Sequence, residues 1–119
     1  MTAMLINNVF AGIAVADLDA ALAWYARLLG RPADRIPMDG LAEWQVTEAG
    51  AIQLIRDAGR AGTGLLTLAV NDLEGYVAAL AEIGLTPGAI NTGVVARFAA
   101  ITDLEGNTIT LAELLGTDD

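Results

Sequence analysis

Two segments of the chain share one pattern of apolar and polar positions. Phe10 to Leu28 reads FAGIAVADLDAALAWYARL, and Leu65 to Ile83 reads LLTLAVNDLEGYVAALAEI. In both, an apolar strand is followed by Ala-Val, one residue that differs between the copies (Ala16 or Asn71), Asp-Leu-acid and a helix. The offset is constant, because 65 minus 10 and 83 minus 28 both give 55. A fixed period of this kind indicates that one structural unit occurs twice.

Each copy carries the signals of a strand followed by a capped helix. A strand is predicted over about Val9 to Val15, after which the Asp17 carboxylate can accept hydrogen bonds from the first turn of a helix. Gly30 stands where a left-handed residue ends a helix. Asp72 and Gly84 occupy the same places in the second copy. The apolar faces, at helical spacing, are Leu18, Leu22, Trp24, Tyr25 and Leu29 in the first helix and Leu73, Val77, Leu80 and Ile83 in the second.

Short strands follow each helix, so that each half is predicted to be a βαβββ module. The segment Asp103 to Asn107 carries Gly106 and reads as a hairpin turn, and its carboxylates are expected to be solvated. The fold class is therefore α+β in a single domain, residues 1–119, with modules at about 7–57 and 64–114. The further strands are predicted at Ala42 to Thr47, Ala51 to Arg56, Val94 to Thr102 and Thr108 to Glu113, with less defined ones near Ile36 and Ile90.

Composition limits the chemistry. The chain has no His, Cys, Lys or Ser, and all six basic residues are Arg. Thiol and imidazole nucleophiles, Schiff bases and the usual Ser or Cys triads are excluded. The usual zinc, copper and iron–sulfur ligand sets are absent as well, which leaves only an all-oxygen metal site.

The net charge of −9 argues against nucleic acid and anionic membrane surfaces as partners, because both need basic patches. A neutral or cationic ligand fits this charge better, although acidity can also serve solubility alone. The sequence offers neither an apolar run long enough for a spanning helix nor the basic start of a signal peptide. We therefore expect a cytoplasmic protein.

Two βαβββ modules, the ALAWYARLLG helix and the late turn D-x-E-G-N-x-I-x-L together resemble the vicinal oxygen chelate superfamily. That superfamily contains glyoxalase I, extradiol dioxygenases, fosfomycin-modifying enzymes and the bleomycin-resistance proteins. The resemblance spans about Val9 to Glu113 and departs at Leu104, where the family often has Pro. It implies mixed sheets that curl into a cup, with the helices on the outer face.

The resemblance places the metal positions of the family at Phe10, Gln53, Leu65 and Thr110, on strands whose alternation sends these side chains into the cup. Only Gln53 could ligate a metal, and one amide is not enough for a divalent cation. No metal and no cofactor are therefore expected. The predicted ligand-binding residues are Phe10, Gly12, Trp44, Gln53, Ile55, Leu65, Thr67, Thr108 and Thr110.

These positions favour a metal-independent small-molecule-binding protein of the bleomycin-resistance type, which would hold an apolar or cationic compound in the cup or in a dimer groove. Arg56 or Arg97 could instead meet an anionic ligand. One alternative is a lyase, isomerase or dioxygenase-like enzyme that uses carboxylate or Tyr chemistry. Another is a degenerate structural domain whose cup is filled by Phe10 and Leu65. A homodimer is expected, because apolar sheet faces and edges need cover.

Overall fold

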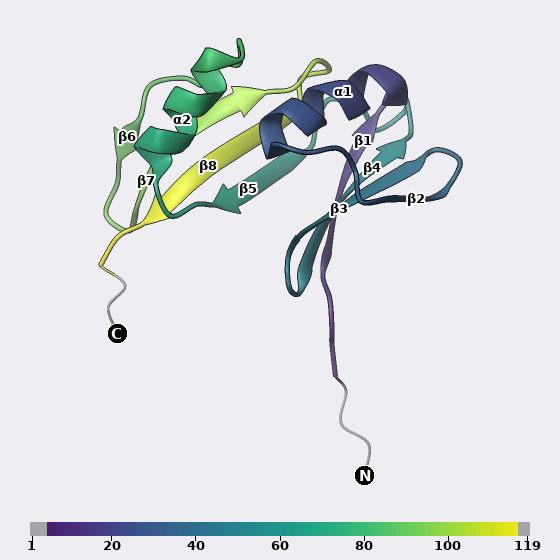
Figure 1. Cartoon of the computed structure of the whole chain (residues 1–119), viewed down its shortest axis with the longest axis horizontal. Helices are drawn as coiled ribbons and strands as arrows, with labels where there is room; N and C mark the ends of the chain where they lie inside the picture. Colours follow the sequence, from purple (N-terminus) through teal and green to yellow (C-terminus); the bar gives the residue numbers. More distant parts are fainter. Residues whose placement is uncertain (1–4, 117–119) are drawn as a thin grey trace.

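A computed structural model describes residues 5–116 of the chain. It contains two units of the predicted βαβββ order, side by side, with both helices in the upper layer of Figure 1. The α+β fold and the tandem modules are thus confirmed. The first unit consists of β1 (Phe10–Val15), α1 (Leu18–Leu29), β2 (Arg35–Met38), β3 (Leu41–Thr47) and β4 (Gly50–Arg56). The second consists of β5 (Leu65–Ala69), α2 (Leu73–Glu82), β6 (Asn91–Thr92), β7 (Ala96–Thr102) and β8 (Thr108–Leu114).

Each unit forms its own four-stranded mixed sheet, in the order β1-β4-β3-β2 and β5-β8-β7-β6. The first and last strands of each unit pair in parallel, with Gly12 opposite Gln53 in the first sheet and Thr67 opposite Thr110 in the second. The other pairs are antiparallel. Because β1 and β5 each have only one partner, both sheets present an unpaired edge where the two units meet.

The helix caps predicted from the repeat are present in both units. The Asp17 carboxylate accepts a hydrogen bond from Ala20 N at 3.1 Å, and Gly30 ends α1 with φ +82°. Asp72 accepts from Gly75 N at 3.1 Å, and Gly84 follows α2 with φ +85°. No helix within residues 5–116 is long and apolar enough to cross a membrane.

The core lies between the helices and the sheets and is continuous across both units. Tyr25 is fully buried, with its ring 4.9 Å from that of Trp24 and 6.4 Å from that of Trp44. The second unit contributes Leu73 and Ile109, both with no exposed surface. A shared core of this kind fixes the two units against each other within one chain.

Two local predictions are wrong. Val94 and Val95 are not part of a strand and are 96% and 70% exposed, because a turn closed by Gly93 N and Ala96 O delays β7 to Ala96. The turn before β8 was predicted to be exposed to solvent, but Asp103 is only 8% exposed and Asn107 is completely buried. Both results depend on contacts that local sequence patterns do not contain.

The buried turn joins the two units. Asn107 Nδ2 donates to the carbonyl of Ala14 in β1 at 3.1 Å, while Asn107 Oδ1 accepts from the backbone N–H groups of Gly62 and Gly64 at 3.1 and 2.7 Å. Tyr25 of α1 donates to Asp103 Oδ2 at 2.8 Å. The side chains of Asp103 and Asn107 in the second unit therefore find hydrogen-bond partners in Tyr25 and Ala14 of the first unit, as buried polar atoms require.

Gly62 provides a test of how tightly this turn is packed. A Cβ atom at this position would lie 2.7 Å from the carbonyl oxygen of Glu105, and φ is +92°. We expect Gly62→Ala to lower the free energy of unfolding by about 2 kcal/mol or more, since it adds a backbone clash to the cost of a left-handed residue. Gly30→Ala is the control, because Gly30 has a similar φ and open space around it. Equal losses in urea titrations of the two variants would contradict the tight packing.

Candidate functional site

The face of each sheet that points away from its helix is the candidate site. In the first sheet this open face carries Phe10, Gly12, Gln53 and Ile55, which the register places on two neighbouring strands. In the second sheet it carries Leu65, Thr67, Thr108 and Thr110. Eight of the predicted ligand-binding residues thus lie in two groups of four, one group per sheet. Phe10 is 47% exposed and Leu65 is 84% exposed, so neither is buried as the filler of a core.

Trp44, the ninth predicted residue, lies on the opposite face. Its side chain has no exposed surface and packs beside Tyr25, and its Nε1 donates to the carbonyl of Arg31 at 2.8 Å. Trp44 therefore offers no stacking surface to a ligand in this structure. The reason is the register of β3, in which Ala42 and Trp44 face the helix while Glu43 and Gln45 face outward.

The four positions that bind metal in the family do not form a chelating site in this chain. Phe10 and Leu65 have no ligand atoms, and Thr110 offers only a hydroxyl. The Gln53 amide is engaged, because its Nε2 donates to Glu43 Oε2 at 2.6 Å. No cluster of three or more carboxylates that could hold a metal occurs within residues 5–116. The donor set present does not fit a divalent cation, which needs several oxygen ligands.

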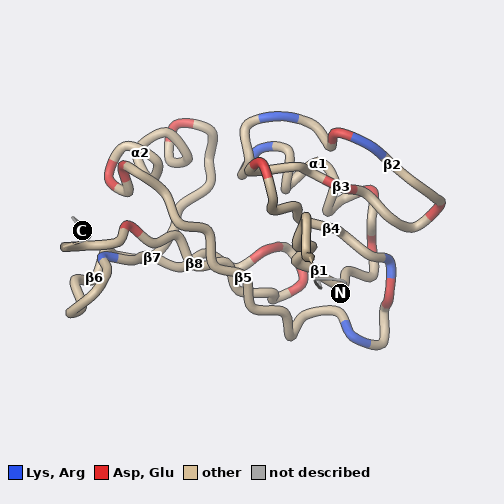
Figure 2. Tube along the Cα trace, turned by 90° about the horizontal axis from the view of Figure 1, so that it is seen from below, with Lys and Arg blue, Asp and Glu red and all other residues tan. Residues whose placement is uncertain are grey.

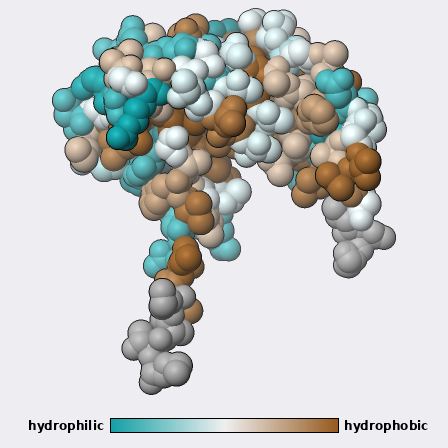
Figure 3. All heavy atoms as spheres, turned by 180° about the vertical axis from the view of Figure 1, so that it is seen from behind, coloured by the Kyte–Doolittle hydropathy of each residue, from teal (hydrophilic) through white to brown (hydrophobic). Residues whose placement is uncertain are grey.

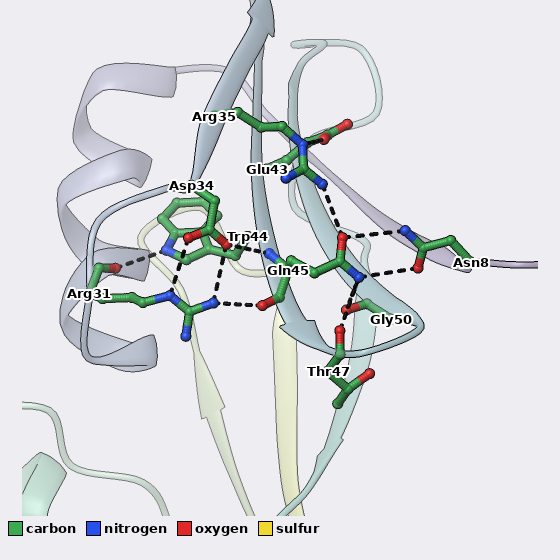
Figure 4. A network of polar contacts seen from close by, with 9 residues as sticks. All are labelled: Asn8, Arg31, Asp34, Arg35, Glu43, Trp44, Gln45, Thr47 and Gly50. Atoms are coloured by element: carbon green, nitrogen blue, oxygen red, sulfur yellow. Dashed lines mark hydrogen bonds and ion pairs between the residues drawn. The ribbon is translucent and has the colours of Figure 1, made fainter.

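A polar network covers the open face of the first sheet, and the sequence analysis did not identify its central residue, Glu43. Glu43 is 6% exposed and accepts from Arg35 Nε at 2.7 Å (Figure 4). It also accepts from Gln53. Arg35 Nη2 also donates to Gln45 Oε1 at 3.0 Å, and Gln45 forms two amide contacts with Asn8 at 3.3 Å. The alternation of Glu43, Trp44 and Gln45 was the available sequence signal. It did not show whether Trp44 or its two polar neighbours lie on the open face of the sheet.

A second polar cluster supports this sheet from its edge. Arg31 Nη2 donates to Asp34 Oδ2 at 3.1 Å and to the carbonyl of Gln45 at 2.6 Å (Figure 4). The hydrogen bond from Arg31, together with that from Gln45 N, holds the pKa of Asp34 below its usual value. The cluster therefore fixes the end of α1 to β3 and leaves the Arg31 side chain 45% exposed.

The two arginines proposed to meet an anionic ligand are otherwise engaged. Arg97 faces α2, where it pairs with Glu74 at 2.7 Å and lies 4.0 Å from Glu113. Glu113 in turn accepts from Leu73 N at the start of α2. Arg56 lies 3.4 Å from the exposed Asp39. Arg97 thus stabilises the helix side of the second sheet and does not reach its open face.

A hollow of about 410 Å³ lies between the two units, lined by residues of both sheets, by Leu29 of α1 and by Tyr76 of α2. We call it the inter-unit hollow. Its walls are formed by Ala11 and Ile52 of the first sheet and by Leu66 and Leu68 of the second, all on helix-facing positions. Of the predicted ligand-binding residues, Thr67 lines it. The hollow therefore shares Thr67 and Ala69 with the open-face side of β5, and the other predicted ligand-binding residues lie outside it.

Two βαβββ units with open sheet faces define a protein of the vicinal oxygen chelate fold. The chain is similar to the crystal structure of a glyoxalase/bleomycin resistance protein from Catenulispora acidiphila DSM 44928, with 34% identity, a TM-score of 0.82, and coverage of 89% of this chain and 96% of that one. The chain therefore belongs to the glyoxalase/bleomycin resistance protein family.

Two further structures share the fold at lower identity. TnmS3, an antibiotic binding protein from Streptomyces sp. CB03234, has 19% identity, a TM-score of 0.78, and coverage of 96% of this chain and 98% of that one. A lactoylglutathione lyase from Agrobacterium tumefaciens has 16% identity, a TM-score of 0.73, and coverage of 87% and 90%. No family model and no curated protein matches the sequence. The neighbours thus include both a binding protein and an enzyme.

Proposed function

We propose that this chain is a metal-independent small-molecule-binding protein whose ligand lies on the open faces of the two sheets. The observation that carries the proposal is the exposure of Phe10 and Leu65 at positions that carry metal ligands in the family. Exposed apolar side chains at such positions favour contact with an apolar or cationic organic molecule over chelation, because burying their surface on binding is favourable. The fold shared with an antibiotic binding protein supports this reading.

The open faces also support a homodimer. Phe98 of β7 is 39% exposed and Ile55 of β4 is 37% exposed, in addition to Phe10 and Leu65. Figure 3 shows apolar side chains gathered on the face seen from behind and along the segment that leads to the N-terminus. A second copy that covers part of this surface would turn an open face into a groove. Light scattering coupled to size-exclusion chromatography measures the assembly directly, and a mass of one chain would contradict the dimer.

A thermal-shift screen with apolar and cationic compounds, with and without a chelator, tests the binding function. A ligand present at about 100 times its Kd stabilises the folded state by about 2.7 kcal/mol, which raises Tm by several degrees. We expect such a shift to be unchanged by the chelator and to be lost in Phe10→Asp and Leu65→Asp.

Leu104→Asp is the matched control, because it places the same charge on an exposed apolar residue of a turn, away from the sheet face. Loss of the shift in this variant as well would indicate a general effect of charge. A shift that requires a divalent metal would contradict the proposal and favour the enzymatic alternative.

A further inference from the structure

The inter-unit hollow arises from a difference between the two repeats. The β7–β8 turn spans residues 103–107 between the paired Thr102 and Thr108, and its Asn107 reaches across to the carbonyl of Ala14. The β3–β4 turn has only two residues, 48 and 49, between the paired Thr47 and Gly50. Within residues 5–116, no side chain of this shorter hairpin bonds to β5. The junction is therefore closed on one side and open on the other.

Comparison of the two repeats identifies a backbone segment of β5, at Ala69, that lacks the side-chain partner found in the first repeat. Ala69 stands 55 residues after Ala14, the offset of the two copies, and it lines the hollow. Val70 N donates to Ala112 O at 2.7 Å, so the neighbouring Ala69 directs its own N–H and C=O away from β8. Ala14 has Asn107 as its partner in the equivalent place, whereas Ala69 faces open space. The hollow is thus the unfilled counterpart of a site that the chain fills in its other half.

The charge around the hollow differs from that of the whole molecule. The protein has 15 acidic residues and a net charge of −9, yet among residues 5–116 no Asp or Glu lines the hollow and Arg31 does. Arg31 follows α1 in the first unit, where Figure 2 shows basic and acidic positions side by side. Arg31 Nε and Nη2 bond to Asp34 and Gln45, whereas Nη1 has no partner among residues 5–116. One guanidinium nitrogen is therefore available at the rim of an otherwise aliphatic space.

The remaining walls suit an alkyl chain. Leu66 and Leu68 of β5 line the hollow together with Val70, which follows β5, and Leu29 lines it from α1. The ring of Tyr76 adds a further apolar wall, and its hydroxyl is already engaged with the carbonyl of Leu28 at 2.7 Å. A volume of about 410 Å³ lies within the range of small-molecule sites.

We propose that the inter-unit hollow is a second ligand site, which shares only Thr67 with the predicted open-face residues, and that it binds an aliphatic carboxylate with the alkyl chain between β5 and α1 and the acid group on Arg31 Nη1. A guanidinium and a carboxylate form a charge-assisted hydrogen bond, which is stronger than a neutral one. The carboxylate nearest to this acid group is Asp34, which bonds to Nε and Nη2 of the same guanidinium and leaves Nη1 for the ligand.

Calorimetric titration with decanoate, decanol and decylamine tests this proposal, because the three probes share one chain length and differ in the head group. We expect decanoate to bind, decanol to bind about tenfold more weakly and decylamine not to bind. Arg31→Gln should weaken decanoate by about tenfold and leave decanol unchanged. Arg60→Gln is the matched control, since Arg60 is exposed, pairs with Asp57 and lies outside the hollow.

Two further variants locate the site. Leu68→Trp fills the hollow and should abolish decanoate binding, and Thr47→Trp blocks the exposed rim without touching the core, which gives a second blocking variant if Leu68→Trp fails to fold. Phe10→Asp, which removes an apolar contact for the ligand proposed on the open face, should leave decanoate binding intact. The proposal is overturned if decanoate does not bind, if decylamine binds equally well, or if Phe10→Asp abolishes binding while Thr47→Trp does not.

Discussion

Asn107→Ala is expected to lower the free energy of unfolding by about 3–5 kcal/mol, because it leaves three part-buried backbone groups and the buried Asp103 carboxylate without this side-chain partner. The amide oxygen of Asn107 accepts from Gly62 N and Gly64 N, and its Nδ2 donates to Ala14 O and to Asp103. An Ala side chain can replace none of these bonds. Asn107 itself has no exposed surface, so these bonds are shielded from bulk water at the Asn107 end.

Asn91→Ala is the control that separates the effect of burial from the loss of an Asn side chain as such. Asn91 is exposed, and its side chain makes one bond, to Ala89 O at 3.2 Å. We expect this change to cost well under 1 kcal/mol, since exposed polar contacts contribute little. Urea unfolding of the two variants, with the wild type at the same pH, measures both values. A loss below about 1 kcal/mol for Asn107→Ala would show that the junction between the units does not depend on this side chain.

The same residue shows where prediction from the sequence stops. The repeat predicted both units, their caps and most strands, because these depend on local spacing and on residues such as Asp17 and Gly30. It could not predict that the turn around Asn107 would be buried, since its partners lie 43, 45 and 93 positions away along the chain. Long-range polar pairing is set by how the two units pack.

The candidate site was also predictable only where it depends on local sequence. Strand alternation placed Phe10, Gln53, Leu65 and Thr110 on the open faces, because the apolar helix-facing residues between them fix the parity. For β3 the parity was ambiguous, since Trp44 lies among polar neighbours and either face was possible. Its burial then determined that Glu43 faces outward beside Gln53. The inter-unit hollow gave no local signal, because it follows from the difference in length between two turns.

Removing the Tyr25 hydroxyl is expected to make the protein less sensitive to alkaline pH. Burial, the hydrogen bond to Asp103 and the negative charges of Asp103 and Glu105 raise the pKa of Tyr25 far above its usual value of about 10. Folding thus favours the neutral phenol. The stabilisation is present in full below pH 10, and it is lost as the pH rises above 10 because only the unfolded chain then ionises. The free energy of unfolding should fall by about 1.4 kcal/mol per pH unit from this group.

The composition makes this measurement unusually clean. With no Lys, Cys or His in the chain, the two tyrosines are the only side chains that titrate between about pH 9 and 12. Tyr25→Phe should lower stability at pH 8 by about 1–2 kcal/mol, through loss of the bond to Asp103, and should flatten the decline between pH 10 and 11.5. Tyr76→Phe is the control: burial also raises the pKa of Tyr76, but this variant retains the contribution of Tyr25.

Urea titrations at half-unit pH intervals give the slopes of the three proteins. A wild-type slope that persists in Tyr25→Phe would show that the Tyr25 phenol ionises in the folded state as it does in the unfolded chain. That result would contradict a closed Tyr25–Asp103 contact, because a phenolate cannot lie 2.8 Å from a carboxylate without strong repulsion. The pH dependence therefore tests the same junction as Asn107→Ala, because Tyr25 of the first unit and Asn107 of the second both bond to Asp103.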